Sequence, residues 1–357
     1  MMGAAEQHYF VCANTAKGFV DYFSSNLADL DRVFILKGGS GTGKSTIMSR
    51  IGKAYQECDY AVEYIHCSSD ANSLDGVIIP DLSVAVVDGT SPHVIEPVLP
   101  GAIEDYVNLG IALERKKLEP HKEEMLALKK EISGHYVKVY DYLQQAAVIK
   151  EKAHVTVQEI LPLEANKQQD IMEQILGKMV LMKKAVLKHR FCGALTAKGD
   201  VYPGLDIAKS AEMRYFISGK HADEVFSLLT EAATERGYDV MLYHDHLQPE
   251  KIIFMAIPEK SLCILNYHYH AVKKLRQPND QWFDFDALES TTAESSQLPN
   301  ASVEDDESER LIAKACEALQ AARKAHGALE QFYYPAVDFE VVEQIYDAIR
   351  SEIAAIG

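Results

Sequence analysis

The stretch Arg32-Val-Phe-Ile-Leu-Lys-Gly-Gly-Ser-Gly-Thr-Gly-Lys-Ser-Thr46 decides which fold the sequence predicts. It begins with β-branched and aromatic residues, continues through the pattern G-x-x-x-x-G-K-[ST], and opens a helical pattern that runs from Ser45 to Gln56. A strand that passes through such a loop into a helix is the context in which this motif binds phosphate. We therefore expect an α/β unit with a P-loop after its first strand.

The chemistry of this motif predicts that the chain binds ATP with Mg²⁺. Glycines allow backbone N–H groups to surround phosphate oxygens, and the start of the following helix attracts anions. Lys44 is expected to reach the β and γ phosphates, and the Ser45 hydroxyl is expected to bind Mg²⁺. The predicted nucleotide-binding (Walker A) residues are Gly38, Gly39, Ser40, Gly41, Thr42, Gly43, Lys44, Ser45 and Thr46.

Asp88 ends a second apolar run, Leu82-Ser-Val-Ala-Val-Val-Asp88. An acid at the carboxyl end of a buried strand fits the Walker B position, so we predict Asp88 as a metal ligand beside Ser45, and Lys44 and Asp88 as the catalytic residues. Gly89 follows, where many ATP-driven motors have a glutamate, and the GTPase pattern Asn-Lys-x-Asp is missing. The pattern favours ATP over GTP and slow turnover.

The chain contains an internal repeat. His8-Tyr-Phe-Val-Cys-Ala-Asn-Thr-Ala-Lys-Gly18 returns as His189-Arg-Phe-Cys-Gly-Ala-Leu-Thr-Ala-Lys-Gly199, and later strands match in the same order. Two copies of one unit are therefore expected, each with apolar strands that alternate with helices. This alternation predicts two tandem P-loop NTPase-like domains of the α/β class, each with a parallel sheet.

The second copy lacks the residues that bind phosphate. Glu224 stands where the first copy has Gly43, Val225 replaces Lys44, and Phe226 replaces Ser45. Asp88 corresponds to Asn266. Because an acid without a lysine repels phosphate, we predict that the second copy does not bind nucleotide.

Apolar residues at spacings of three and four predict a helical hairpin after each copy. Each hairpin either packs against its own domain or forms an arm for a homodimer or another protein partner. The resulting predicted boundaries are 1–100 for the P-loop domain, 101–188 for a helical hairpin, 189–276 for the degenerate domain, 277–310 for a mobile acidic loop and 311–357 for a C-terminal helical hairpin.

Composition limits the class of protein. The formal net charge of −17 argues against nucleic-acid binding, which requires Lys and Arg to neutralise phosphates. No apolar run approaches the roughly 20 residues that span a bilayer, and the six cysteines include no C-x-x-C pair. We expect a cytoplasmic protein that has no contact with a membrane.

Several other residues are candidates without an assigned role. Asp70 and Asp75 follow the second strand, where P-loop kinases often hold the acceptor, although both fit ordinary turns equally well. His93 is a candidate to face the γ-phosphate, and Arg115 is a candidate lid arginine. In the second copy a transition-metal site competes with the interpretation that the histidines are structural; these are His221, His244, His246, His268 and His270.

Together, Gly-Thr-Gly-Lys-Ser-Thr46, Cys67-Ser-Ser-Asp70 and Asp88-Gly-Thr-Ser-Pro-His93 resemble a poorly characterised family of bacterial tandem P-loop ATPase-like proteins. The resemblance covers most of the chain and implies two P-loop folds and nucleotide binding, without a substrate. Three functions follow as alternatives: slow ATP hydrolysis or ATP sensing coupled to an inert second domain, a small-molecule or nucleotide kinase, and a nucleotide-gated scaffold that holds ATP unchanged.

Overall fold

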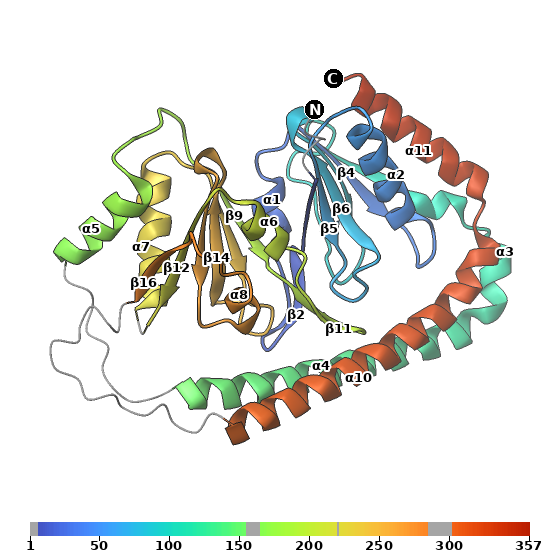
Figure 1. Ribbon diagram of the computed structural model, residues 1–357. Helices are drawn as coiled ribbons and strands as arrows, with labels where there is room; N and C mark the ends of the chain where they lie inside the picture. Colours follow the sequence, from blue (N-terminus) through green and yellow to red (C-terminus); the bar gives the residue numbers. More distant parts are fainter. Residues whose placement is uncertain (1–5, 155–164, 220, 285–301) are drawn as a thin grey trace.

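The computed structural model describes residues 6–154, 165–219, 221–284 and 302–357. It contains two α/β units, each built on a six-stranded sheet (Figure 1). The first sheet has the order β1-β5-β6-β7-β4-β8, and the second has the equivalent order β9-β13-β14-β15-β12-β16. The strands of the first are β1 (Glu6–Tyr9), β4 (Arg32–Lys37), β5 (Val62–His66), β6 (Leu74–Ile79), β7 (Val84–Asp88) and β8 (Glu104–Asn108). Those of the second are β9 (Leu187–Phe191), β12 (Met213–Ser218), β13 (Val240–His244), β14 (Ile252–Ile257), β15 (Leu262–Asn266) and β16 (Gln281–Asp284).

The two sheets are mixed, so the prediction of parallel sheets was wrong in this respect. β6 and β14 run antiparallel to both of their neighbours, while the other neighbouring strands run parallel. Each antiparallel strand joins the next through a short 3₁₀ turn, Pro80–Leu82 or Pro258–Lys260. So short a connection permits only an antiparallel pair, because a parallel crossover needs a dozen or more residues.

The helices that follow β4 and β12 occupy equivalent places in the two units. They are α2 (Lys44–Gln56) and α7 (Ala222–Glu235), and each packs its apolar side on its own sheet. Each unit also carries a small β-hairpin and a short helix: β2 (Cys12–Thr15), β3 (Gly18–Asp21) and α1 (Phe23–Leu27) in the first, and β10 (Ala194–Thr196), β11 (Gly199–Val201) and α6 (Leu205–Ser210) in the second. The predicted repeat is therefore visible in the fold.

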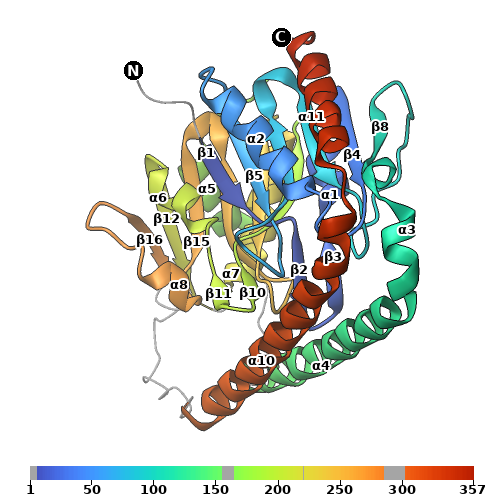
Figure 2. The ribbon, with the colours of Figure 1, turned by 90° about the vertical axis from the view of Figure 1, so that its right-hand side faces the viewer.

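The long helices do not form two separate hairpins, which corrects that prediction. Instead α4 (Lys122–His154) packs antiparallel along α10 (Ser302–Tyr333), and the pair runs beneath both units (Figures 1 and 2). The apolar spacings that predicted each hairpin meet across this pair, with Val139 and Leu143 from α4 in one cluster with Ala315 and Leu319 from α10. The helix pair links the two copies.

The tails beyond this pair are exchanged between the units. The helix α5 (Ala165–Leu176) follows the first copy in sequence but packs on α7 of the second unit. The helix α11 (Phe339–Ala354) follows the second copy but joins the apolar core around α2 of the first unit. Of the two alternatives for each hairpin, packing against its own domain is therefore wrong for α5 and α11.

The two units also contact each other directly. Phe10 and Phe191, which occupy the same place in the repeat, form an antiparallel bridge through their backbones. Beside them Arg190 is buried and its guanidinium donates to Glu63 of the first unit at 2.8 Å. The two units are thus joined by a packed interface in addition to the helix pair.

Two further expectations can be compared with the structure. Within the predicted mobile loop at 277–310, residues 285–301 lie outside the described part of the chain, but β16 and the start of α10 replace loop on either side. Among the described residues, no helix is both long and apolar enough to span a membrane.

Candidate functional site

The residues between β4 and α2 form a tight loop, which we call the glycine loop (residues 38–43). Gly41 and Gly43 have φ values of 69° and 91°. Residues with a Cβ rarely adopt this left-handed conformation, so the glycines allow the chain to turn before the first residue of α2. The loop therefore directs the N–H groups at the start of α2 toward the carboxyl edge of the sheet, where an anion is favoured.

The side chain of Lys44, the first residue of α2, reaches back to this loop. Its ammonium donates to the carbonyl oxygens of Gly38 at 3.2 Å and Gly39 at 2.9 Å. The same nitrogen lies 3.6 Å from Oδ2 of Asp88, and both side chains are mostly buried, at 11% and 13% exposure. The structure thus brings together the cation and the acid that the sequence analysis paired.

Asp88 and Ser45 are held by neighbouring backbone groups. Oδ1 of Asp88 accepts hydrogen bonds from the N–H of Thr90 at 2.8 Å and from its hydroxyl at 2.5 Å. The hydroxyl of Ser45 accepts from the N–H of Leu74 at 2.9 Å. One hydroxyl and one carboxylate form a small donor set, and Mg²⁺ at phosphate sites is commonly held by one or two protein oxygens with water and phosphate.

Asp75 and His93 form a buried pair close to Asp88. Nε2 of His93 lies 3.4 Å from Oδ1 of Asp75, and the side chains are 7% and 5% exposed. Burial opposes protonation of His93, but the carboxylates of Asp75 and Asp88 raise its pKa to about 9. His93 is therefore positively charged at neutral pH, and its charge is balanced by Asp75 and Asp88.

The helix α10 crosses the glycine loop, which the sequence analysis did not anticipate. Nε2 of His326 lies 3.2 Å from the Ser40 hydroxyl. A Cβ at Gly39 would lie 2.7 Å from the ring of Tyr333, so the backbone of the loop touches this ring. Residues 323, 326, 330 and 333 share one face of the helix. Their spacing of three and four residues is the pattern in the sequence that indicates this shared face.

Asp70 lies after the strand β5, as the sequence predicts, whereas Arg115 is exposed on a short helix. Asp70, in the loop after β5, pairs with Arg323 of α10 at 2.6 Å, and the neighbouring Ser69 shares a hydrogen bond with Tyr136 of α4 at 2.7 Å. Arg115 belongs to the short helix α3 (Arg115–Leu118), where it is 86% exposed and pairs with Glu119. Arg323 belongs to α10, the helix whose His326 and Tyr333 contact the glycine loop.

The equivalent loop of the second unit is closed by its own side chains. Val225 and Phe226 are buried in the core of the unit, at 1% and 0% exposure. His221, also fully buried, pairs with Glu224 at 2.9 Å, and the ring of His268 lies 3.0 Å from the carbonyl oxygen of Gly219. The start of α7 is thus covered by imidazole, carboxylate and apolar groups.

The histidines of the second unit do not form the metal site considered above. His244 contacts His189 at 2.9 Å, and His246 contacts Asp200 at 3.0 Å on the small hairpin. Within the described residues no group of three or more His, Cys, Asp or Glu side chains is arranged to hold a metal ion. The rings of His244, His246 and His268 each have a different polar partner, so these three rings do not meet at one site.

Comparisons with protein-family models, with curated proteins and with solved structures found no match to this chain. The resemblance to tandem P-loop proteins therefore stays a prediction based on the motifs themselves.

Proposed function

We propose that this chain is an ATP-binding P-loop protein whose first unit binds Mg²⁺–ATP and passes its nucleotide state to the α4–α10 helix pair. In this proposal the glycine loop holds the phosphates, Lys44 neutralises the β and γ phosphates, and Ser45 and Asp88 bind Mg²⁺. The second unit does not bind nucleotide and anchors the far end of the helix pair.

The observation that carries the sensing part is the position of α10. Its residues contact the glycine loop at Gly39 and Ser40, and Arg323 pairs with Asp70 on the neighbouring loop. A triphosphate in the glycine loop changes the charge directly beside these contacts. Because α10 is packed against α4, we expect a shift at the loop to reach both helices.

Slow turnover is supported by the packing around Gly89. A Cβ at this position would lie 2.4 Å from Cγ2 of Ile35, so a glutamate cannot stand directly after Asp88 without displacing the core. The kinase alternative has less support. Its expected acceptor site lies beside Asp70 and Asp75, and these carboxylates are paired with Arg323 and with buried His93.

Titration with a fluorescent ATP analogue and Mg²⁺ tests the proposal. We expect one nucleotide per chain and at least tenfold weaker binding for Lys44→Ala, because a charge-assisted contact contributes about 1.5–3 kcal/mol and each decade costs about 1.4 kcal/mol. Lys251→Ala is the matched control, since Lys251 pairs with Asp223 at the start of α7 in the second unit. Asp88→Asn should keep most of the affinity and lose its dependence on Mg²⁺.

Sensing needs a separate readout. Amide hydrogen exchange across residues 323–333 should slow when ATP is added to the parent protein and should not change in Lys44→Ala. Equal affinity of parent and Lys44→Ala would refute the nucleotide site. Normal binding without any change in α10 would leave the site intact and refute the coupling.

A further inference from the structure

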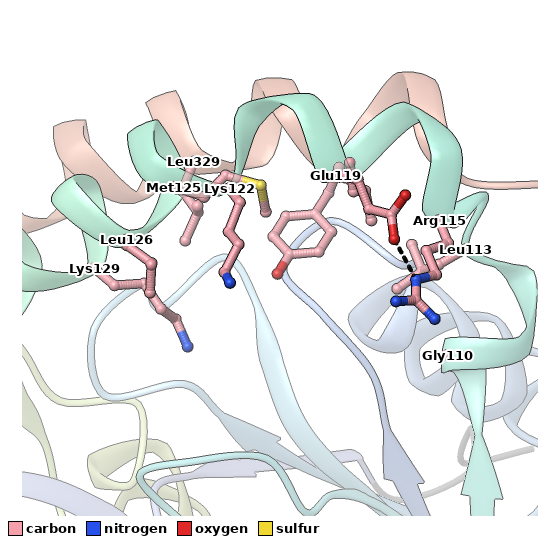
Figure 3. A pocket seen from close by; sticks show the side chains of 11 residues that line it. Gly110, Leu113, Arg115, Glu119, Lys122, Met125, Leu126, Lys129 and Leu329 are labelled. Carbon is pink, nitrogen blue, oxygen red and sulfur yellow. Dashed lines mark hydrogen bonds and ion pairs between the residues drawn. The ribbon is translucent and has the colours of Figure 1, made fainter.

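A cavity lies beside the glycine loop, beneath the N-terminal part of α4. It has a volume of about 450 Å³ and is bounded by α3, the start of α4, the end of α10 and the turn Leu109–Ala112 (Figure 3). This volume lies within the range of about 300–1,000 Å³ that is typical of small-molecule sites. Apolar side chains form much of the wall, among them Leu113, Met125, Leu126 and Leu329.

The polar side chains of this wall are mainly cations. Arg115 is balanced by Glu119, whereas Lys122 and Lys129 form no ion pair with any residue in the described part of the chain. Figure 3 shows both lysines extending from the same side of α4 toward the space below it. Two unbalanced ammonium groups over an apolar wall favour a ligand that is both anionic and apolar, in a chain whose net charge is −17.

The cavity is separate from the phosphate site but shares a wall with it. Tyr333 lines the cavity and also packs against Gly39 of the glycine loop. The turn Leu109–Ala112, which bounds the cavity, also touches the loop. A Cβ at Gly38 would lie 3.0 Å from Cβ of Leu109. A ligand here lies next to the phosphate-binding loop without occupying it.

We propose that this cavity binds a small organic anion, a carboxylate, sulfonate or phosphate ester with an apolar body, as a ligand distinct from the nucleotide. Lys122 and Lys129 bind the anionic group, and the leucine and methionine side chains bind the apolar body. The site does not depend on nucleotide binding, so it is tested independently of the function proposed above.

The test uses 8-anilinonaphthalene-1-sulfonate, an aromatic anion whose fluorescence rises in apolar surroundings. We expect one saturable site per chain in the parent protein and at least tenfold weaker binding in Lys122→Glu/Lys129→Glu. The matched control is Lys116→Glu/Lys130→Glu, which makes the same charge change at exposed positions outside the cavity and should bind within twofold of the parent. Met125→Trp fills the cavity without changing its charge and should also weaken the probe.

Two results would overturn this proposal. One is equal probe affinity in the cavity variants and the control variant, which would place the probe elsewhere on the surface. The other is stoichiometric displacement of the probe by Mg²⁺–ATP, which would make the cavity part of the nucleotide site. Retention of the probe at saturating ATP, with the loss in both cavity variants, supports a distinct ligand.

Discussion

The glycine loop of the first unit and its counterpart in the second unit both follow a strand and lead into a helix, but they differ in where the helix begins and in which side chains they carry. The helix α2 begins at Lys44, whereas α7 already begins at Ala222, which corresponds to Gly41 in the repeat. In the first, the side chain of Lys44 reaches back to the loop with its ammonium near Asp88, and both side chains remain partly accessible. In the second, Val225 and Phe226 at the equivalent positions belong to the apolar core. A few residues around the start of one helix thus distinguish the proposed ATP site from its buried counterpart.

In the second unit, the N–H groups at the start of α7 have no phosphate to bind them in the proposed arrangement. The N–H groups of a helix N-terminus need partners, which phosphate supplies in P-loop proteins. Here Asp223 and Glu224 stand in the first turn of α7, where acidic side chains are favoured by the helix dipole. The second unit therefore carries its own anions at the place where we propose that the first binds ATP.

The largest effect is expected when the first loop is given the acid of the second. Gly43→Glu places a carboxylate beside the phosphates and forces a side chain into a φ of 91°, with its Cβ 3.3 Å from Cγ1 of Val342. We expect ATP binding to weaken at least a hundredfold, which corresponds to about 2.7 kcal/mol. Isothermal titration calorimetry measures this loss.

Gly101→Glu is the matched control, since Gly101 has a φ of 78° and open space around its Cβ position. It carries similar backbone strain and the same added charge, away from the loop. A loss of binding in Gly101→Glu equal to that in Gly43→Glu would mean that strain alone, without any phosphate contact, separates the two loops.

An intermediate effect concerns the pH dependence of stability. The folded pKa of His93, about 9, lies above its ordinary value of 6.5, because Asp75 and Asp88 outweigh burial. Protonated His93 therefore contributes stability that is complete below pH 6.5 and is lost as the pH rises through about 9, on the order of 1–3 kcal/mol. His93→Gln should remove this decline in thermal unfolding profiles between pH 6.5 and 9.

His244 of the second unit supplies the opposite case. Burial, with His189 as a further cause, lowers its pKa to about 4, so its contribution is present above pH 6.5 and is lost as the pH falls toward 4. His244→Gln should flatten only the acidic side of the profile. Identical profiles for the two variants would contradict the assignment of different charge states to the two units.

The sequence predicted the local structure of the loop well and the long-range arrangement poorly. Strand, glycine loop and helix follow from neighbouring residues, and the repeat predicted a second unit of the same topology. By contrast, the antiparallel direction of Leu74–Ile79 is set by the short turn after this strand. The exchange of α5 and α11 between units was invisible, because an apolar helical stripe does not specify which surface it covers.

Two residues near the candidate site, Arg323 and His326, could not be predicted from the sequence for the same physical reason. Arg323 and His326 are about 280 residues away from the glycine loop, and they reach it only because α10 packs on α4. Lys44 and Asp88, in contrast, end up 3.6 Å apart because adjacent parallel strands end at the same edge of the sheet. The motifs therefore predict the pair that one sheet positions, whereas residues positioned by tertiary packing leave no such motif in the sequence.

The smallest effect is expected for Arg323→Ala, which tests whether the difference between the two loops extends beyond the loop residues. Arg323 and Asp70 are partly exposed, at 43% and 29%, so their ion pair should contribute less than about 1 kcal/mol to stability. The same guanidinium lies on the helix that contacts the glycine loop, so it adds positive charge on the side of the proposed ATP site. We therefore expect ATP to bind about two- to fivefold more weakly, with a thermal midpoint close to that of the parent.

Lys324→Ala is the control for this variant, since it removes an exposed cation from the next position of α10. Calorimetric titration of both variants and the parent at two salt concentrations separates a local contact from the general field of the protein, because exposed charges more than about 10 Å apart are screened at 0.1 M salt. Equal losses in the two variants at low salt that vanish at high salt would restrict the difference between the units to the glycine loop. A loss confined to Arg323→Ala that persists at high salt would extend the nucleotide site onto α10, and the helix that joins the two units would then belong to the site of only one of them.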